Sequence, residues 1–203
     1  MTRRAITLVV LVGALALLAS RPAVAQQPGD EEQAAIQAMM EAYEQYGALG
    51  APHKGLARRV GTWKVQARFW MTPGSPPQMS DGTSEVSLIM DGRYVMERFE
   101  MKTPDGPFHG LGIVGYDNIK KRYQSIWVDA MSTGIMTAEG PGDLDARSIE
   151  YTGQEPDPVS HAYKPYRSVE RQLDDDTRRL ETFETSPDGK EFKAMELFYT
   201  RDK

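Results

Sequence analysis

The recurrence of turn-forming residues after residue 60 constrains this chain more than any other feature of its sequence. Segments rich in Gly, Pro, Asn and Asp lie about ten residues apart, among them TPGSPPQ, TPDGP, GPGDLD and SPDGK. Apolar and polar residues alternate between these segments, which is the pattern of half-buried β-strands. The spacing predicts ten strands, over residues 61–71, 82–90, 93–101, 108–116, 122–129, 134–140, 147–153, 165–173, 178–186 and 191–201.

Ten short strands without helices between them favour one architecture. Strands joined in order by short turns form an antiparallel meander, and closing the meander into a barrel removes both exposed edges. We therefore expect an all-β domain over residues 53–203, an antiparallel up-and-down closed β-barrel of about ten strands. The length of 203 residues and the hydrophobic content of 40% suit one such domain.

An N-terminal α-helix and a connector are expected before the barrel, within residues 26–52. Asp30 is a suitable N-cap with Gln33 three residues later, and Gly47 and Gly50 provide a stop. Apolar residues recur between them at helical spacing: Ile36, Met39, Met40, Tyr43 and Tyr46. The pattern predicts a helix over about residues 31–47 with an apolar packing face, and a short helical turn at HKGLARR.

The first 25 residues have the organisation of a signal peptide. Arg3 and Arg4 precede the apolar run AITLVVLVGALALLAS, and the sequence ending at Ala25 has the small-x-small form that signal peptidase cleaves. The run is shorter than the roughly 20 residues of a spanning helix. We expect cleavage after Ala25, a periplasmic or secreted protein, and no membrane span after cleavage. The adjacent arginines leave a twin-arginine route open, although the Ile and Thr that follow fit the Sec route better.

Composition narrows the classes of function. Cleavage after Ala25 removes three arginines and no acidic residue, so the formal charge changes from −5 to −8. An acidic surface repels phosphate backbones, which argues against nucleic acid as a partner. The chain has no cysteine, which excludes disulfides, thiolate catalysis, cysteine-based metal sites and a lipoprotein anchor.

The first predicted strand begins at Gly61 and carries a tryptophan two residues later. Alternation places Trp63 on the same face as Phe69, so Trp63 is expected to point into the interior. A Gly-x-Trp at the start of the first strand resembles the calycin superfamily of lipocalins and fatty-acid-binding proteins. That resemblance implies an arginine on the last strand that packs across the tryptophan, and Arg201 lies at that position, where it would form a cation–π contact.

Six runs of the sequence also resemble one bacterial family in their order and spacing. They are VGTWKV (60–65), GRYVMERFE (92–100), GLGIVGYDNIKKRY (110–123), SIWVDAMSTG (125–134), DDDTRRLETFE (174–184) and DGKEFKAMELFYTR (188–201). Through them the chain is similar to the family of domain of unknown function 1579. The resemblance implies a calycin-like barrel and export, and it implies no particular chemistry.

Motifs of common functional sites are matched only in part. GLGIVG at 110–115 has the glycine spacing of dinucleotide-binding loops, but it lies inside a strand with no helix behind it, so its glycines are expected to allow close approach. DDDT and GDLD lack calcium-loop spacing, and no serine lies in G-x-S-x-G. His53, His109 and His161 favour loop or surface positions, with His161 the best candidate for a haem ligand. We expect no cofactor and no metal.

Polar residues on strands that also carry aromatics are the candidate binding residues. In RYQSIWVDAM one face carries Tyr123, Ser125, Trp127 and Asp129, and the other carries apolar residues. If the first face points inward, it supplies an aromatic wall with hydroxyls and a carboxylate, which is typical of a small-molecule pocket. The alternative turns this face outward, under the N-terminal helix.

The run RYVMERFEM presents the same choice. Tyr94 and Arg98 lie on one face, and Glu97 and Phe99 lie on the other, so either Arg98 or Glu97 faces the interior and requires a charged partner or a ligand. By analogy with fatty-acid barrels, an inward arginine with Tyr199 would hold an acidic head group. The predicted ligand-binding set is Tyr94, Arg98, Tyr123, Ser125, Trp127, Asp129, Phe183 and Tyr199.

Three classes of function fit this sequence. A carrier of a small apolar or amphipathic molecule is favoured, because closed barrels of this length often enclose one ligand. A cell-envelope interaction module with a filled barrel is the first alternative. An enzyme that uses Asp129 as general base, with Tyr123 or Arg98 stabilising charge, is the second. Glu170 and Arg171 pose a further choice of face, and the ligand and the oligomeric state stay open.

Overall fold

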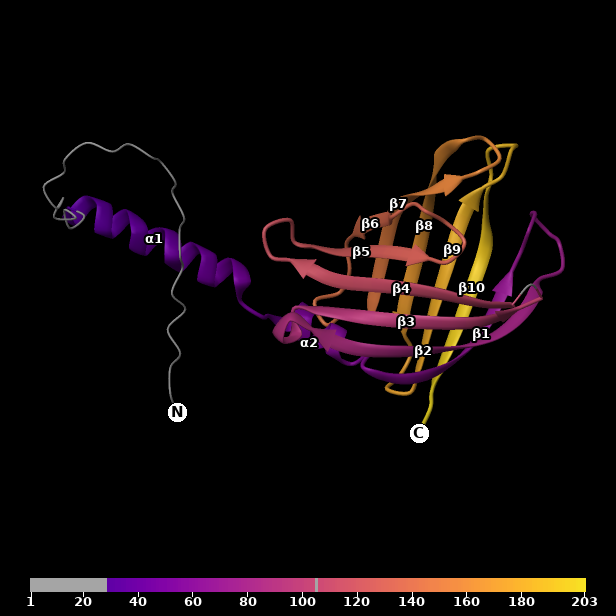
Figure 1. Cartoon of the computed structure of the whole chain (residues 1–203), viewed down its shortest axis with the longest axis horizontal. Coiled ribbons are helices and arrows are strands. Elements are labelled where there is room, and N and C mark those ends of the chain that lie inside the picture. Colours follow the sequence, from indigo (N-terminus) through magenta and orange to yellow (C-terminus); the bar gives the residue numbers. More distant parts are fainter. Residues whose placement is uncertain (1–28, 105) are drawn as a thin grey trace, which may run out of the picture. The chain divides into compact units, whose positions relative to one another are not determined.

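The structure is a computed structural model that describes residues 29–104 and 106–203 (Figure 1). The predicted signal peptide over residues 1–25 lies outside this range. The chain divides into two units, Met1–Glu41 and Ala42–Lys203. Helix α1 (Asp30–Gly47) begins and ends within one residue of the predicted helix, and its apolar stripe is exposed. The predicted packing role of that stripe stays a prediction.

The second unit contains a short helix and ten strands. The elements after α1 are α2 (Ala51–Ala57), β1 (Gly61–Phe69), β2 (Gln78–Ile89), the 3₁₀ turn η1 (Met90–Gly92), β3 (Tyr94–Thr103), β4 (Gly106–Asp117), β5 (Arg122–Asp129), β6 (Met136–Gly140), β7 (Ser148–Asp157), β8 (Ala162–Gln172), β9 (Thr177–Thr185) and β10 (Glu191–Arg201). Each corresponds to a predicted strand or turn. The largest differences in bounds lie at the start of β2 and the end of β7.

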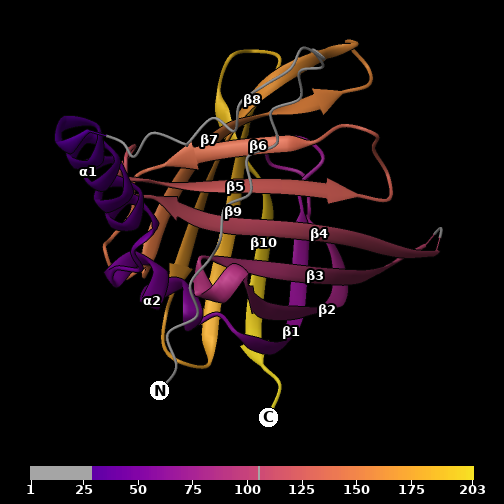
Figure 2. The same cartoon turned by 60° about the vertical axis from the view of Figure 1, so that its left-hand side comes forward.

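The ten strands form one closed antiparallel barrel in which sequence neighbours pair (Figures 1 and 2). β1 pairs with β10, in a register that runs from Trp63 opposite Arg201 to Phe69 opposite Met195. This pairing closes the ring, so neither terminal strand keeps a free edge. The predicted up-and-down barrel with a preceding helix is confirmed.

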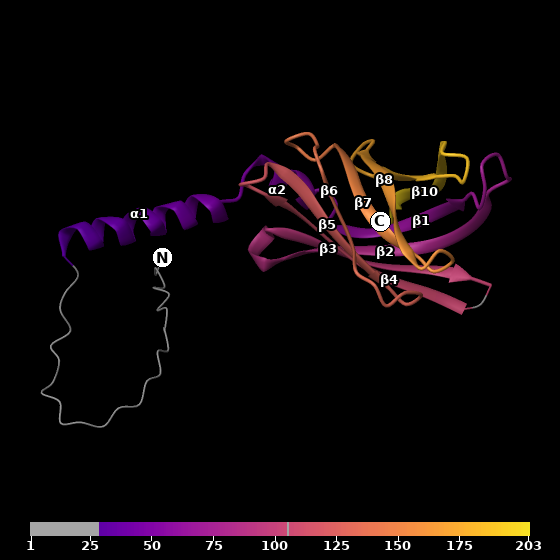
Figure 3. The same ribbon diagram turned by 90° about the horizontal axis from the view of Figure 1, so that it is seen from above.

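Helix α2 lies at the end of the barrel where β1 begins (Figure 3). It packs on β3 and β4, and Leu56 is buried in the core. A Cβ at Gly55 would overlap the backbone of Asp145 between β6 and β7. Glycine at this position therefore lets α2 approach that connection more closely than a residue with a side chain would allow. The side chain of His53 is also buried, accepts a hydrogen bond from the Gly50 N–H (3.0 Å) and contacts Tyr116 edge-on. His53 is therefore a packing residue, which corrects its predicted loop or surface position.

The glycines of GLGIVG allow an aromatic ring to lie against β4, as predicted. Gly112 is the register partner of Trp127 on β5. A Cβ built at Gly110 would overlap the Trp127 ring, and one built at Gly112 would lie 3.3 Å from it. The motif therefore serves packing inside the barrel, without the helix that a nucleotide loop requires.

Candidate functional site

The closed end of the barrel is fixed by Trp63, which lies between two arginines. The guanidinium carbon of Arg201 lies 4.2 Å from the Trp63 ring centroid, and that of Arg178 lies 5.2 Å from it. The fully buried indole donates its N–H to the Arg59 carbonyl (2.9 Å). Gly61 has φ of +133°, and a Cβ there would lie 2.5 Å from the Arg201 guanidinium. The predicted contact between Arg201 and Trp63 is thus present, and Gly61 makes room for it.

Above this end the barrel encloses a cavity of about 380 Å³. Side chains from most of the strands line it, and the majority are apolar. Its apolar wall includes Phe69, Phe99, Phe108, Trp127, Met136 and Leu180. Met131, in the connection after β5, also lines the cavity and is 82% exposed. The cavity therefore reaches the surface at the end opposite α2.

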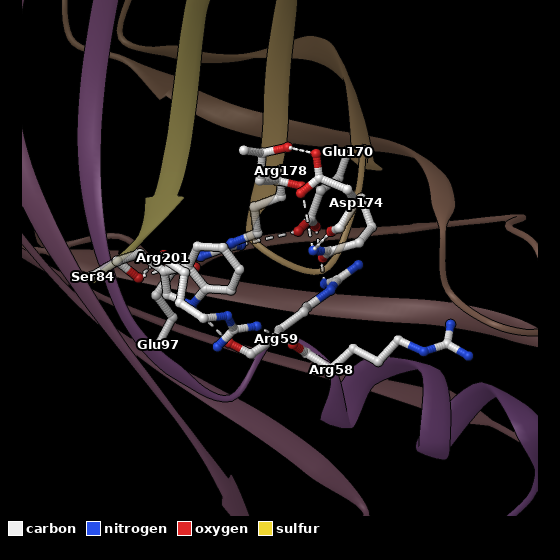
Figure 4. Close-up of polar contacts among 11 residues, drawn as sticks. Arg58, Arg59, Ser84, Glu97, Glu170, Asp174, Arg178 and Arg201 are labelled. Atoms are coloured by element: carbon white, nitrogen blue, oxygen red, sulfur yellow. Dashed lines mark hydrogen bonds and ion pairs between the residues drawn. The ribbon is translucent and has the colours of Figure 1, made fainter. Parts of the chain in front are cut away.

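Four charged side chains form the inner end of the cavity (Figure 4). We call Arg59, Glu97, Glu170 and Arg178 the interior ion cluster. Arg178 binds Glu97 through Nη2 (3.0 Å) and Glu170 through Nη1 (3.1 Å), while Arg59 binds the other oxygen of Glu170 (2.9 Å). Ser84 donates its hydroxyl to the Glu97 oxygen that Arg178 also binds (2.5 Å). The four formal charges sum to zero.

The surroundings of Arg178 keep its guanidinium charged. Burial alone would lower the pKa of Arg178, but Glu97, Tyr199 and Glu170 together outweigh burial and raise the pKa above its usual value. The guanidinium also stacks on Tyr199, 3.6 Å from the ring centroid. Burial holds the pKa of Tyr199 well above its usual value, so its phenol is neutral. Both arginines of the cluster are thus charged, and each is neutralised by carboxylates.

Among the described residues that line the cavity, two have a buried donor without a hydrogen-bond partner, Arg178 at its Nε and Tyr151 at its hydroxyl. Tyr151 lines the cavity and is 4% exposed. Its hydroxyl lies near the Arg59 guanidinium but makes no hydrogen bond of acceptable geometry within the described part of the chain. Burial raises the pKa of Tyr151, so the hydroxyl keeps its proton. By contrast, the hydroxyls of Ser168 and Thr182, also in the lining, satisfy each other at 2.9 Å.

The structure brings together three of the predicted ligand-binding residues. Ser125, Trp127 and Tyr199 line the cavity, so the Tyr-Ser-Trp face of β5 points inward, as in the first of the two predicted orientations. Tyr123 points the same way but lies outside the cavity lining, fully buried, and donates its hydroxyl to the Asp143 carbonyl (2.6 Å). Its role in the structure is packing.

Asp129 also lies outside the cavity lining. Its carboxylate accepts hydrogen bonds from the Trp127 indole (3.0 Å) and from the Met131 N–H (2.9 Å). Both oxygens are therefore used to hold the Trp127 ring and the connection after β5. This corrects the placement of Asp129 as a cavity carboxylate.

Three predicted residues lie on the outer face, which corrects their predicted orientation. On β3 the inward face carries Val95, Glu97 and Phe99, so Tyr94 and Arg98 point away from the cavity. On β9 the inward residues are Arg178, Leu180 and Thr182, and Phe183 instead packs under Arg167 (4.2 Å). In both strands the physical reason is the two-residue period, which reverses every side chain when the phase is chosen wrongly.

Three residues at the inner end of the cavity were not identified from the sequence, namely Arg59, Tyr151 and Arg178. Arg59 lies between α2 and β1, outside any periodic pattern. Arg178 stands in a pair of arginines on a strand, and that pair signals that one of them faces inward. Glu170 was one of two alternatives, and the structure selects it over Arg171. Tyr151 carries no sequence signal beyond its strand.

The described residues offer neither a cluster of metal ligands nor a helix that could span a membrane. Within residues 29–104 and 106–203, no group of three His, Asp or Glu side chains could hold a metal ion. His161, the candidate haem ligand, is exposed in the turn between β7 and β8 and lies outside the cavity lining, which corrects that possibility. None of the described helices combines the length and apolar character of a membrane span.

Comparisons with known proteins concern the barrel fold and the family of the chain. No curated protein matches the sequence. Solved structures that resemble the chain include a redesigned β-barrel, with 14% identity over 74% of this chain and 96% of that one and a TM-score of 0.42. Another is a de novo designed fluorescence-activating β-barrel, with 15% identity over 73% and 98% of the two chains and a TM-score of 0.40. The family model described as "Protein of unknown function (DUF1579)" matches residues 48–201, and the chain belongs to this family.

Proposed function

We propose that this protein binds a small apolar or amphipathic molecule inside its barrel. The observation that carries the proposal is a cavity of about 380 Å³ with an apolar wall and a few buried polar groups at its inner end. Sites for small molecules typically have volumes of about 300–1,000 Å³ and this division of lining. The cavity is also reached from the surface beside Met131, which gives a ligand a way in.

The lining supports a binding role over the two alternatives. A barrel with a packed interior would need side chains that fill the space. The side chains of Met101, Met136, Met195 and the phenylalanines line the cavity but leave it open. The carboxylate of Asp129 is held by the Trp127 indole and a backbone N–H, so it is poorly placed to act as a general base. Burial of an apolar ligand against these walls would supply about 25 cal/mol for each Å² removed from water.

Mass spectrometry under native conditions tests this proposal. The protein is purified from its own periplasm or culture medium, its intact mass is measured, and the material released on denaturation is identified. We expect a stoichiometric adduct that is lost on unfolding. A bare polypeptide mass that also stays unchanged after exposure to fatty acids, fatty alcohols and aromatic metabolites would overturn the proposal.

A matched pair of variants on β4 tests whether the ligand binds in the cavity. Val114 lines the cavity, whereas Ile113 is on the opposite face of the same strand. Val114→Phe fills part of the cavity and is expected to abolish the fluorescence gain of the apolar dye phenylnaphthylamine. Ile113→Phe adds the same bulk outside and is expected to leave it unchanged. Equal effects of the two variants would contradict a cavity site.

We also propose that the protein works outside the cytoplasm. The charged start, the apolar run and the small-x-small sequence ending at Ala25 support this proposal. The N-terminal residue of protein recovered from envelope and medium fractions is the test. Gln26 at the N-terminus is expected, and a chain that keeps residues 1–25 in the cytoplasmic fraction would refute it.

A further inference from the structure

The charge balance at the inner end of the cavity restricts the chemistry of the ligand. The interior ion cluster contains two guanidiniums and two carboxylates, and each guanidinium already contacts a carboxylate at 2.9–3.1 Å. Arg59, Arg178 and Glu170 are all buried. Of the described residues that line the cavity, Arg59 and Arg178 carry the positive charge, and neither is therefore left to neutralise an arriving anion.

A carboxylate ligand would bring an unpaired negative charge to this end. It would either remain unpaired in a desolvated site or displace Glu97 or Glu170 from Arg178. Both alternatives are costly, because a buried charge without a partner loses its hydration and gains nothing in return. The cluster thus disfavours the acidic head groups that an inward arginine would bind if it were free.

An uncharged polar group of a ligand would be favoured at this end of the cavity. Tyr151 lines the cavity. Its buried hydroxyl keeps its proton and has no hydrogen-bond acceptor for it among the residues that the structure describes. A hydroxyl or carbonyl oxygen of a ligand can accept this proton in a hydrogen bond without breaking any ion pair. Leaving such a buried donor unsatisfied costs more than a typical hydrogen bond contributes, so occupancy by an acceptor is favoured.

We propose that the cavity selects apolar molecules ending in an uncharged hydrogen-bonding oxygen, such as alcohols, ketones or esters, over the corresponding carboxylates, and that Tyr151 binds that oxygen. This inference rests on the proposed binding function. It extends that function by naming the class of ligand and the residue that recognises it.

A displacement assay with two probes of equal chain length tests the selectivity. Phenylnaphthylamine is bound to the wild-type protein, and decanol or decanoate is added at about pH 8, where carboxyl groups are ionised. Decanol is expected to displace the dye at a concentration about tenfold or more below that of decanoate, a ratio that corresponds to about 1.4 kcal/mol. Decanoate binding as tightly as decanol would overturn the inference. Failure of the dye itself to bind would instead count against the proposed function.

Two variants test the physical cause. Tyr151→Phe removes only the hydroxyl and is expected to weaken decanol binding about fivefold relative to dye binding by the same variant. Tyr116→Phe makes the same change at a tyrosine outside the cavity lining and is expected to leave decanol binding unchanged. A loss that is equal in Tyr151→Phe and Tyr116→Phe would refute the role of Tyr151.

Glu97→Gln tests the charge balance directly. Glu97 is the most exposed member of the cluster, with a side chain 21% exposed, and glutamine keeps an acceptor for Ser84 and Arg178. The variant leaves the cluster with one net positive charge. It is expected to improve decanoate binding about tenfold relative to decanol, because the new charge now favours an anion. An unchanged ratio in a variant that melts cooperatively would refute the argument from charge.

Discussion

Removal of the Arg201 guanidinium is expected to destabilise the barrel at its closure. Arg201 donates to the carbonyls of Val60 (2.7 Å), Arg58 (3.0 Å) and Asp175 (2.9 and 3.1 Å) and stacks on Trp63 (4.2 Å). These contacts join the segment before β1, the turn between β8 and β9, and β10. The side chain thus connects three parts of the chain that are far apart in sequence.

The magnitude follows from these contacts. Hydrogen bonds from a charged donor contribute about 1.5–3 kcal/mol each, but the Arg201 side chain is 24% exposed, so water replaces part of what is lost. We take about 1 kcal/mol for the hydrogen bonding to each of the three carbonyls and do not count the cation–π contact, which gives a loss of about 3 kcal/mol in the free energy of unfolding. For a domain of this size that corresponds to a fall in Tm of about 6–12 °C.

Thermal unfolding followed by far-ultraviolet circular dichroism measures the effect. Arg201→Met keeps the aliphatic stem over Trp63 and removes the guanidinium, while Arg201→Lys keeps the charge but not the planar fork and is expected to lose most of the same stability. Arg122→Met is the control, because Arg122 is exposed and its distance to Glu139 is 3.7 Å. A Tm for Arg201→Met within about 2 °C of that control would refute the reasoning.

Three further perturbations test other parts of the structure. Gly110→Val is expected to displace the Trp127 ring, shift its fluorescence emission and cost about 1–3 kcal/mol, because its Cβ overlaps that ring; an unchanged emission spectrum would contradict this packing. Burial raises the pKa of Tyr123 to about 12, above about 10 in the unfolded chain, so stability is retained below about pH 10 and falls as the pH rises toward 12. Urea titrations across this range should show a shallower fall for Tyr123→Phe. Glu170→Gln leaves both buried arginines short of a counter-charge, so the free energy of unfolding measured by urea titration is expected to fall by about 3–5 kcal/mol. Glu191→Gln is the control, because Glu191 lies in an exposed ion pair, and a loss of about 1 kcal/mol or less is expected.

The architecture could be predicted because its signals are local. Turn residues and alternation identify strands one at a time, and a run of adjacent antiparallel strands has few arrangements. The contact between Trp63 and Arg201 could be predicted for a different reason, because the first strand resembles that of known barrels. In β1 the inward phase was unambiguous, because Lys64, Gln66 and Arg68 occupy the other face.

The inner end of the cavity could not be predicted because it depends on contacts distant in sequence. On β3, alternation allows either Glu97 or Arg98 to face inward, and only a partner decides between them. That partner is Arg178 of β9, 81 residues from Glu97. Arg59 enters the cluster from the connection after α2, where no period exists. A local pattern therefore indicates that a charge faces inward without indicating which one.

The pairing of β1 with β10 also determines when the barrel can form during synthesis. Arg201 pairs with Trp63 across almost the whole domain, so an N-terminal fragment that lacks β10 leaves β1 with an open edge. Contacts of such long sequence separation slow folding, and unpaired edges invite association with other chains. The nascent domain therefore depends on protection of that edge until its tenth strand is available.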